Sequence, residues 1–136
     1  MQLSDTLKIA ASGMKAQGDR LRVVAENIAN ADSTSATPGG EPYRRKVVMF
    51  QNVLDRELGI ESVKVVKRTH DQSDFKKKFD PSHPAADEQG YVLYPNVNTI
   101  VEMMDMREAR RGYEANLNMI EISKSMLTRT IDLLRG

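Results

Sequence analysis

The chain has 136 residues, 40% of them hydrophobic, which fits one ordinary domain with its own core and leaves no room for a second full domain. Twenty lysines and arginines against nineteen aspartates and glutamates give a net charge of +1, so no overall field draws the molecule to nucleic acid or acidic lipid. The absence of cysteine excludes disulfides, thiolate metal ligands and thiol nucleophiles. Asp5 and Lys8 interrupt the apolar residues of the first segment, so we expect no cleavable signal peptide, and no segment is apolar enough to predict a transmembrane helix.

The first predicted element is a helix that begins at Leu3 and ends near Asn30. Apolar residues recur in it at alternating intervals of three and four, which is the spacing of one helix face and of a coiled-coil seam. The predicted seam residues are Leu3, Leu7, Met14, Leu21, Val24 and Ile28. Asn27 and Asn30 lie at the end of this helix, where they either cap exposed carbonyls or form hydrogen bonds across an interface.

The next segment, residues 32–96, has a different character. Residues 32–42 contain serine, threonine, proline and adjacent glycines without periodicity, which predicts a loop. Four short runs favour β-strands, with a break expected near Leu58 and Gly59. These runs are Tyr43–Phe50, Val63–Val66, Phe75–Phe79 and Tyr91–Tyr94. We therefore predict a central segment of loops and short strands.

The last segment, residues 97–136, repeats the spacing of the first. Its seam is predicted to follow Met103, Met106 and Arg110, to pass through Lys124, and to include Tyr113, Leu117, Ile120, Leu127, Ile131 and Leu134. The predicted fold is mainly α with a small β-rich insertion, in which helices 1–31 and 97–136 pair as one antiparallel coiled-coil domain. Apolar residues off the seam, such as Ile122 and Met126, indicate contacts with other subunits.

Side chains that carry chemistry form no convincing catalytic or metal site. His70 and His83 are the only histidines, and no cysteine completes a zinc set. Ser82 is merely adjacent to His83, and neighbours on an extended chain point apart. The acidic pairs Asp87 with Glu88 and Glu102 with Asp105 are interpreted as solvated carboxylates. We expect no catalysis, no cofactor and no metal.

Two basic runs, Arg44-Arg45-Lys46 and Lys76-Lys77-Lys78, are interpreted as a solvated strand face or as salt bridges between subunits. Neighbouring aromatic residues leave open a nucleic-acid-binding adaptor, although Glu41, Asp74 and Asp80 interrupt the positive surface. A small enzyme that uses His83 with a nearby acid is the other alternative. Neither alternative explains two matched helical stripes.

Several motifs, in order, resemble those of one family. Ser12-Gly13-Met14 and Ala25-Glu26-Asn27-Ile28-Ala29-Asn30 are similar to the N-terminal signature of the bacterial flagellar axial proteins of the rod and hook. Pro42-Tyr43-Arg44, Asp80-Pro81-Ser82-His83-Pro84, Gly90-Tyr91-Val92 and Arg111-Gly112-Tyr113-Glu114-Ala115-Asn116 continue the resemblance. The signature residues carried over are Asn27, Asn30, Tyr43, Asp80, Pro81, Tyr91, Pro95, Asn96, Asn98 and Asn116. Lys76-Lys77-Lys78 and Ala85 depart from the pattern, because less basic residues and an acid are expected there.

The resemblance implies a structural subunit of the proximal rod in the flagellar basal body. Family members are exported unfolded through the flagellar type III apparatus and polymerise with copies of themselves and with other rod proteins. The resemblance thus implies a rod that crosses the periplasm after synthesis of its subunits in the cytoplasm. It also implies terminal helices that form an inner coiled-coil tube, with no enzymatic activity and no nucleic-acid partner.

Overall fold

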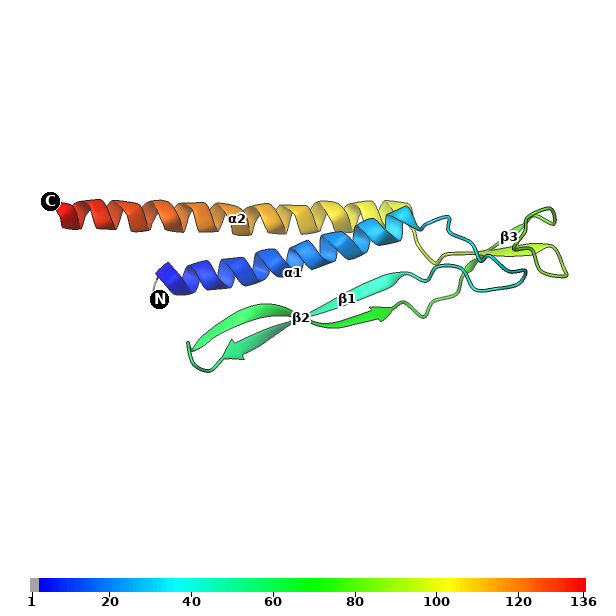
Figure 1. Cartoon of the computed structure of the whole chain (residues 1–136), viewed down its shortest axis with the longest axis horizontal. Helices are drawn as coiled ribbons and strands as arrows, with labels where there is room; N and C mark the ends of the chain where they lie inside the picture. The colour runs from blue at the N-terminus through cyan, green and yellow to red at the C-terminus, as the bar shows by residue number, and fades with distance from the viewer. Residues whose placement is uncertain (1–2) are drawn as a thin grey trace. The chain divides into compact units, whose positions relative to one another are not determined.

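The computed structural model describes residues 3–136, apart from the side chain of Val66. The predicted segment 1–31 also included Met1 and Gln2, which lie outside the described residues. The elements are α1 (Leu3–Ala29), β1 (Lys46–Asp55), β2 (Ile60–His70), β3 (Lys76–Phe79), β4 (Tyr91–Tyr94) and α2 (Thr99–Arg135) (Figure 1). The chain divides into two compact units, whose boundaries fall within α1, β1, β2 and α2. Unit 1 contains the chain through Leu21, Met49–Lys67 and Arg107–Gly136, and unit 2 contains Arg22–Val48 and Arg68–Met106.

In unit 1, α1 and α2 pack together and run in opposite directions (Figure 1). Arg20 Nη2 lies 3.4 Å from Glu108 Oε2, and a Cβ at Gly13 would meet Asn116 Nδ2 at 2.8 Å. These two contacts pair later residues of one helix with earlier residues of the other. Glycines at the contact allow the two backbones to approach closely, because no side chain separates them. The predicted antiparallel packing of the two helices is therefore present.

Strands β1 and β2 form a two-stranded sheet joined by a tight turn, which confirms the break expected near Leu58 and Gly59. Gly59 has a φ of +66°, where an L side chain is strained, and its N–H donates to the Asp55 carbonyl at 2.8 Å. The Val63 N–H donates to Ser12 Oγ at 3.2 Å, which attaches the sheet to α1 within unit 1.

The two strands run well beyond the predicted runs Tyr43–Phe50 and Val63–Val66, and β1 also begins later, at Lys46. Polar residues such as Gln51 and Asn52 do not end β1, because both side chains are exposed although they point to opposite faces of the strand.

In unit 2, β3 and β4 pair antiparallel, with Lys76 opposite Tyr94 and Phe79 opposite Tyr91. Strand β4 has the predicted bounds, and β3 begins one residue later than the predicted run. Val92, Pro95 and Val97 are fully buried and form the core beside this small sheet.

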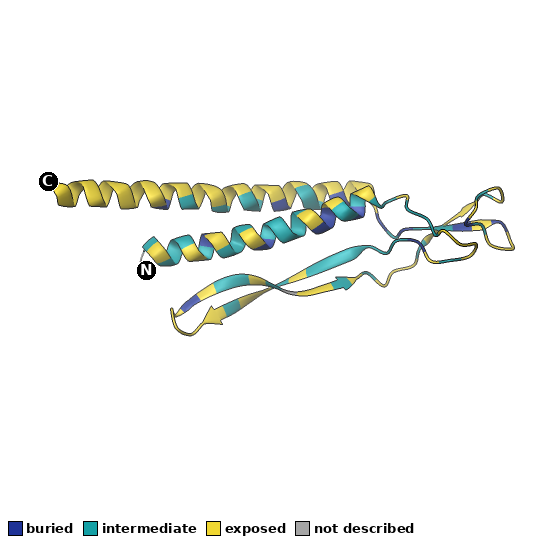
Figure 2. Ribbon diagram, viewed as in Figure 1, coloured by how far each residue is buried: buried dark blue, intermediate teal, exposed yellow. Residues whose placement is uncertain are grey.

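Helix α2 begins where Asn98 caps it. The Asn98 Oδ1 accepts a hydrogen bond from the Ile100 N–H at 3.1 Å, which satisfies one of the free donors at the helix start. At the other end, residues 124–136 are all exposed (Figure 2). Among the helices of residues 3–136, none combines the length and apolar character needed to cross a membrane.

Candidate assembly surfaces and buried polar cluster

Asn27 lies at the centre of a polar cluster in unit 2. Its Nδ2 donates to the Lys46 carbonyl at 2.9 Å and to Glu102 Oε2 at 3.4 Å. Its Oδ1 accepts from the Tyr43 hydroxyl at 2.7 Å and from the Lys46 N–H at 2.9 Å. Two donors and two acceptor sites are therefore all used, as a buried amide requires. Asn27 thus joins α1, β1 and α2 rather than capping its own helix.

The interpretation of Glu102 and Asp105 as solvated acids is wrong. Its side chain is fully buried in the first turn of α2, where it accepts hydrogen bonds from Asn27 and from Arg45 Nε. A buried carboxylate is stable only when it is paired and hydrogen-bonded, and the guanidinium of Arg45 supplies the opposite charge. Asp105, one turn later, lies 3.6 Å from Arg45 Nη2. The two acids therefore hold one arginine.

Arg45 is the cation of this cluster. Its Nη1 also lies 3.3 Å from Asp71 Oδ2, so three carboxylates surround one guanidinium. Burial acts to lower the pKa of Arg45, but the hydrogen bonds and charges of Glu102 and Asp71 outweigh it and hold the pKa above its usual value. Arg45 was predicted to lie on a solvated strand face or to form a salt bridge between subunits. Its salt bridges instead form within the chain.

Asn96 attaches the segment before β1 to the segment after β2. Its Oδ1 accepts from the Arg45 N–H at 2.8 Å, and its Nδ2 donates to the carbonyls of Asp71 and Ser73 at 3.0 and 3.2 Å. The Ser73 N–H in turn donates to Asp71 Oδ1 at 2.8 Å. Hydrogen bonds from the backbone and side chain of Ser73, with Arg45 adding to them, lower the pKa of Asp71.

The rim of the cluster is more exposed. Lys46 Nζ donates to Glu26 Oε2 at 2.9 Å, and this hydrogen bond lowers the pKa of Glu26 and raises the pKa of Lys46. Burial is the main cause that raises the pKa of the Tyr43 phenol. The cluster thus combines exposed ion pairs on its rim with buried hydrogen bonds and a buried carboxylate inside.

The structure brings some of the predicted signature residues together and separates others. Asn27, Tyr43 and Asn96 meet in the cluster. Asn30 makes a local cap, since its Nδ2 donates to the Glu26 carbonyl at 2.9 Å. The others lie elsewhere: Asn98 caps α2, Asn116 bonds to the Gly112 carbonyl, Pro95 is buried, and Asp80, Pro81 and Tyr91 lie at the turn of the β3–β4 pair. Sequence reasoning missed Arg45 and Glu102 as partners, because 57 residues separate them and no local spacing links them.

The predicted seam residues differ in burial within the single chain. Val24 is buried, whereas Leu3, Leu7, Met14, Leu21, Ile28, Tyr113 and Ile120 are half-buried and Leu117, Leu127, Ile131 and Leu134 are exposed. On α2 the buried positions are Glu102, Ala109 and Ser123, each one residue before the predicted Met103, Arg110 and Lys124. The packed face is thus rotated from the apolar stripe. Small side chains permit close helix packing. Helix α1 therefore packs against small and polar residues of α2, with Tyr113 beside Gly18, and leaves apolar residues such as Leu117 and Leu127 exposed.

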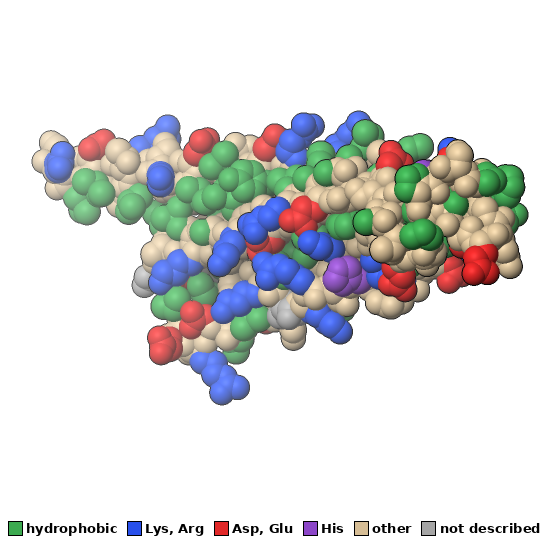
Figure 3. Space-filling view, turned by 45° about the vertical axis from the view of Figure 1, so that its right-hand side comes forward, with side chains coloured by type: hydrophobic (Ala, Val, Ile, Leu, Met, Phe, Trp, Pro, Cys, Tyr) green, Lys and Arg blue, Asp and Glu red, His purple; other side chains and the backbone are tan. Residues whose placement is uncertain are grey.

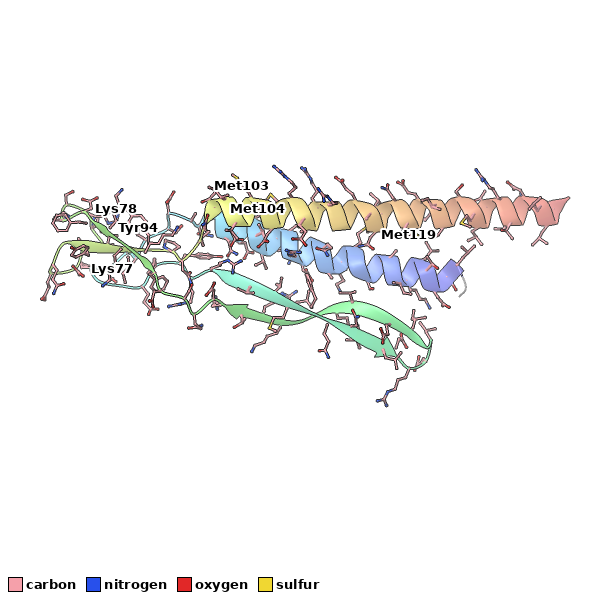
Figure 4. The ribbon with its side chains drawn as sticks, turned by 180° about the vertical axis from the view of Figure 1, so that it is seen from behind. Lys77, Lys78, Tyr94, Met103, Met104 and Met119 are labelled. Atoms are coloured by element: carbon pink, nitrogen blue, oxygen red, sulfur yellow. The ribbon has the colours of Figure 1, made fainter. Side chains whose placement is uncertain are left out.

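Helix α2 therefore carries an exposed apolar stripe, visible as hydrophobic side chains along the long helix in Figure 3. Its members towards the C-terminus are Leu117, Met119, Ile122, Met126, Leu127, Ile131, Leu133 and Leu134, with Leu134 83% exposed. Near the start of α2, Met103 and Met104 project outward from the helix (Figure 4). An exposed apolar surface of this extent is typical of protein interaction sites.

His83 makes a local hydrogen bond. The His83 Nδ1 accepts a hydrogen bond from the Ala85 N–H at 3.0 Å, so this histidine stabilises a turn. Within residues 3–136, no three histidines, aspartates or glutamates gather as a metal would require. Lys76, Lys77, Lys78 and Tyr94 line an open hollow of about 380 Å³ beside the start of α2.

Flagellar rod proteins match this chain over nearly its whole length. The family model described as flagella basal body rod protein matches residues 7–36, and the model of the C-terminal part of the flagellar basal body rod FlgEFG protein matches residues 88–133. The flagellar basal-body rod protein FlgC of Agrobacterium fabrum is 53% identical over 98% of this chain and 96% of its own. The FlgC proteins of Borreliella burgdorferi and Salmonella typhimurium are each 40% identical, over 100% of both chains and over 98% of both chains, respectively.

Proposed function

Because this chain belongs to the FlgC family of flagellar basal-body rod proteins and is a structural subunit of the rod, we propose that it builds the proximal part of that rod by polymerising through its terminal helices. Its partners are copies of itself and other rod proteins, and the finished rod crosses the periplasm as the drive shaft of motility. The family is a structural one.

The exposed apolar stripe of α2 is the observation that supports this proposal best. Gly13 lies against Asn116 and Gln17 against Gly112, so residue numbers rise along α1 as they fall along the facing part of α2. The same antiparallel register places Leu3 opposite Met126. The turns of α2 after that level have no α1 residue opposite them, yet they carry Leu127, Ile131 and Leu134. Exposed leucines and isoleucines cost free energy in water, so a neighbouring subunit that covers them stabilises the assembly.

In this proposal the seam residues act at two levels. The half-buried ones join α1 to α2 as an antiparallel coiled coil within one subunit. The exposed ones, Leu117, Leu127, Ile131 and Leu134, join that helix pair to neighbouring subunits in an inner tube. The segments 1–31 and 97–136 then form one helical domain, and the polar cluster around Asn27 joins the start of β1 to the end of α1 and the start of α2.

Export precedes assembly. We infer that the chain passes unfolded through the flagellar type III apparatus. A chain without cysteine forms no disulfide that could block threading. Helices gain most of their stability from packing. Residues 124–136 of α2 are exposed in the described chain, so they become ordered most fully when neighbouring subunits cover them.

Deletion of the gene, followed by electron microscopy of purified basal bodies and a swimming assay, tests the proposal. We expect basal bodies that retain rings but lack rod and hook, with motility restored by the gene on a plasmid. Complete basal bodies in the deletion strain would contradict the proposed role.

A further inference from the structure

Strand β3 carries three consecutive positive charges that the small sheet does not balance. The residues opposite Lys76, Lys77 and Lys78 on β4 are Tyr94, Leu93 and Val92, and none of them is acidic. The Lys76 Nζ donates to the Val97 carbonyl at 2.7 Å. Lys77 and Lys78 make no ion pair within the part of the chain that the structure describes. Opposite charges that face each other across strands stabilise a sheet, and β4 supplies none here, so Lys77 and Lys78 remain available to an acid from outside the sheet.

One face of the sheet combines a positive charge with exposed aromatic rings. Side chains alternate along a strand, so Lys77 and Phe79 lie on the same face, and their partners in register place Tyr91 there too. The rings of Phe79 and Tyr91 meet edge to face with centroids 5.3 Å apart. Phe79 is 62% exposed. Figure 4 shows Lys77 on its strand. We call Lys77, Phe79 and Tyr91 the basic-aromatic face.

The turn of the β1–β2 sheet has the complementary chemistry. Leu54 and Leu58 are exposed there, and Glu57 and Glu61 are exposed beside them. Residues 54–61 contain three acids and one arginine, so this segment is negative as well as apolar. We call Leu54, Glu57, Leu58 and Glu61 the acidic-leucine tip. Like the basic-aromatic face, it exposes apolar side chains that water solvates poorly.

We propose that the acidic-leucine tip of one copy docks on the basic-aromatic face of a second copy. Glu57 then pairs with Lys77, and the leucines cover the rings of Phe79 and Tyr91. Two different surfaces of the same chain that fit each other make a head-to-tail contact, which produces an open helical array when the rotation between copies does not close a ring. This inference rests on the proposed function, because the array is the rod.

The contact is only one part of a subunit interface. A stable pair of proteins uses about 20–30 residues from each partner, and this contact uses far fewer. The contact therefore forms within the assembled rod, where other contacts already hold the copies in place. For this reason its tests use assembled rods rather than the isolated chain. Opposite charges also set which surfaces meet, more than how tightly they bind.

Crosslinking between copies tests the contact. The chain has no cysteine, so Arg56→Cys beside the tip and Gln89→Cys beside the face are introduced into two separate copies expressed together in one motile strain. A short bismaleimide applied to purified basal bodies is expected to yield a band of twice the chain mass, stronger than from Arg56→Cys with Ala36→Cys. Rods that contain both copies but give no such band overturn the proposal, as does a band that joins the chain to a different rod protein.

The same experiment separates failure of this contact from failure of the proposed function. If the proposed function is wrong, the chain is absent from the rod.

Charge exchange provides a second test that does not depend on a crosslink. We expect Lys77→Glu and Glu57→Lys each to reduce swimming and rod recovery, and the double variant to restore both. Lys77→Arg, which keeps the charge, is the matched control and is expected to swim normally. If the lysines serve only to keep strand β3 from pairing with other strands, Glu57→Lys has no effect and the double variant is no better than Lys77→Glu. That pattern overturns the proposal.

Discussion

The Asn27 amide, near the end of α1, donates to the Glu102 carboxylate, near the start of α2, and both side chains are buried. The two residues are 75 positions apart, so folding alone brings them together. Through Arg45 and Lys46 the same pair holds the beginning of β1. One buried amide and one buried carboxylate thus connect both terminal helices to the central segment.

Removal of the Glu102 carboxylate tests how much this cluster stabilises the chain. Glu102→Ala removes the one fully buried carboxylate that pairs with Arg45, while Arg45 keeps the less buried Asp71 and Asp105. Loss of one member of a buried ion pair costs about 3–5 kcal/mol. We expect a correspondingly lower free energy of unfolding in urea, followed by circular dichroism. Glu26→Ala removes the exposed ion pair with Lys46 and should leave the urea midpoint almost unchanged. Equal effects from the two variants would contradict the central role of Glu102.

Asn27→Asp is nearly isosteric but replaces the donating nitrogen with an oxygen. At pH 7 the new carboxylate faces the Lys46 carbonyl and the Glu102 carboxylate, and this repulsion raises its pKa. We therefore expect strong destabilisation at pH 7 that is partly relieved near pH 4, as the new carboxyl takes up a proton. Tyr43→Phe removes one hydrogen bond to the same amide and should cost only about 1 kcal/mol at both pH values. Thermal melts at the two pH values provide the comparison.

Two glycines of α1 are expected to respond differently to alanine. A Cβ at Gly18 would lie 3.9 Å from Tyr113 Cε2, which is ordinary contact. Gly18→Ala therefore gains helix propensity and stabilises the chain by about 0.5–1 kcal/mol. A Cβ at Gly13 would meet Asn116 Nδ2 at 2.8 Å, so the Asn116 side chain must move and Gly13→Ala gains less. Urea unfolding of both variants measures the difference, and a larger gain for Gly13→Ala would contradict the packing of α1 on α2.

Leu117→Asp tests the exposed stripe of α2. Leu117 is 38% exposed in the single chain, so a charge there perturbs the fold of the subunit less than its contacts with neighbours. We expect loss of rod incorporation and swimming, because the contact with a neighbour would bury an unpaired carboxylate, while secretion of the chain continues. Asn118→Asp introduces the same charge at an exposed polar neighbour and is expected to swim. Normal motility of Leu117→Asp would argue against the stripe as an interface.

Acid should weaken unit 2 through Asp71. Folding holds the pKa of Asp71 below its ordinary value of 3.8, so the folded chain favours the deprotonated carboxylate. Its contribution to stability is fully present above that ordinary value and is lost as the pH falls through the lower pKa of the folded state. Asp71→Asn should lower stability at neutral pH and make the fall in acid less steep. The urea midpoint, followed from pH 7 to pH 3 for both proteins, measures this; parallel curves would exclude Asp71 as a cause.

Sequence reasoning was most successful where structure depends on local patterns. The two long helices, the turn at Gly59 and strand β4 follow from periodicity, glycine and β-branched or aromatic runs, all within a few residues of one another. It was weaker at β1 and β2, where an exposed two-stranded sheet tolerates polar residues that normally end a strand. It failed for Glu102, because the spacing of an acid along a helix does not reveal whether an arginine lies opposite.

The sequence by itself determined the helical ends, the β-rich middle and, through its resemblance to relatives, the family of flagellar rod proteins. Only the tertiary structure decided which face of α2 packs against α1 and which polar residues become buried. The reason is physical: periodicity shows that a helix has an apolar stripe, but packing chooses the face where backbones approach most closely. Gly13 lies against Asn116 of α2 and Ala109 is buried, whereas larger apolar side chains of α2 such as Leu127, Ile131 and Leu134 are left on the surface.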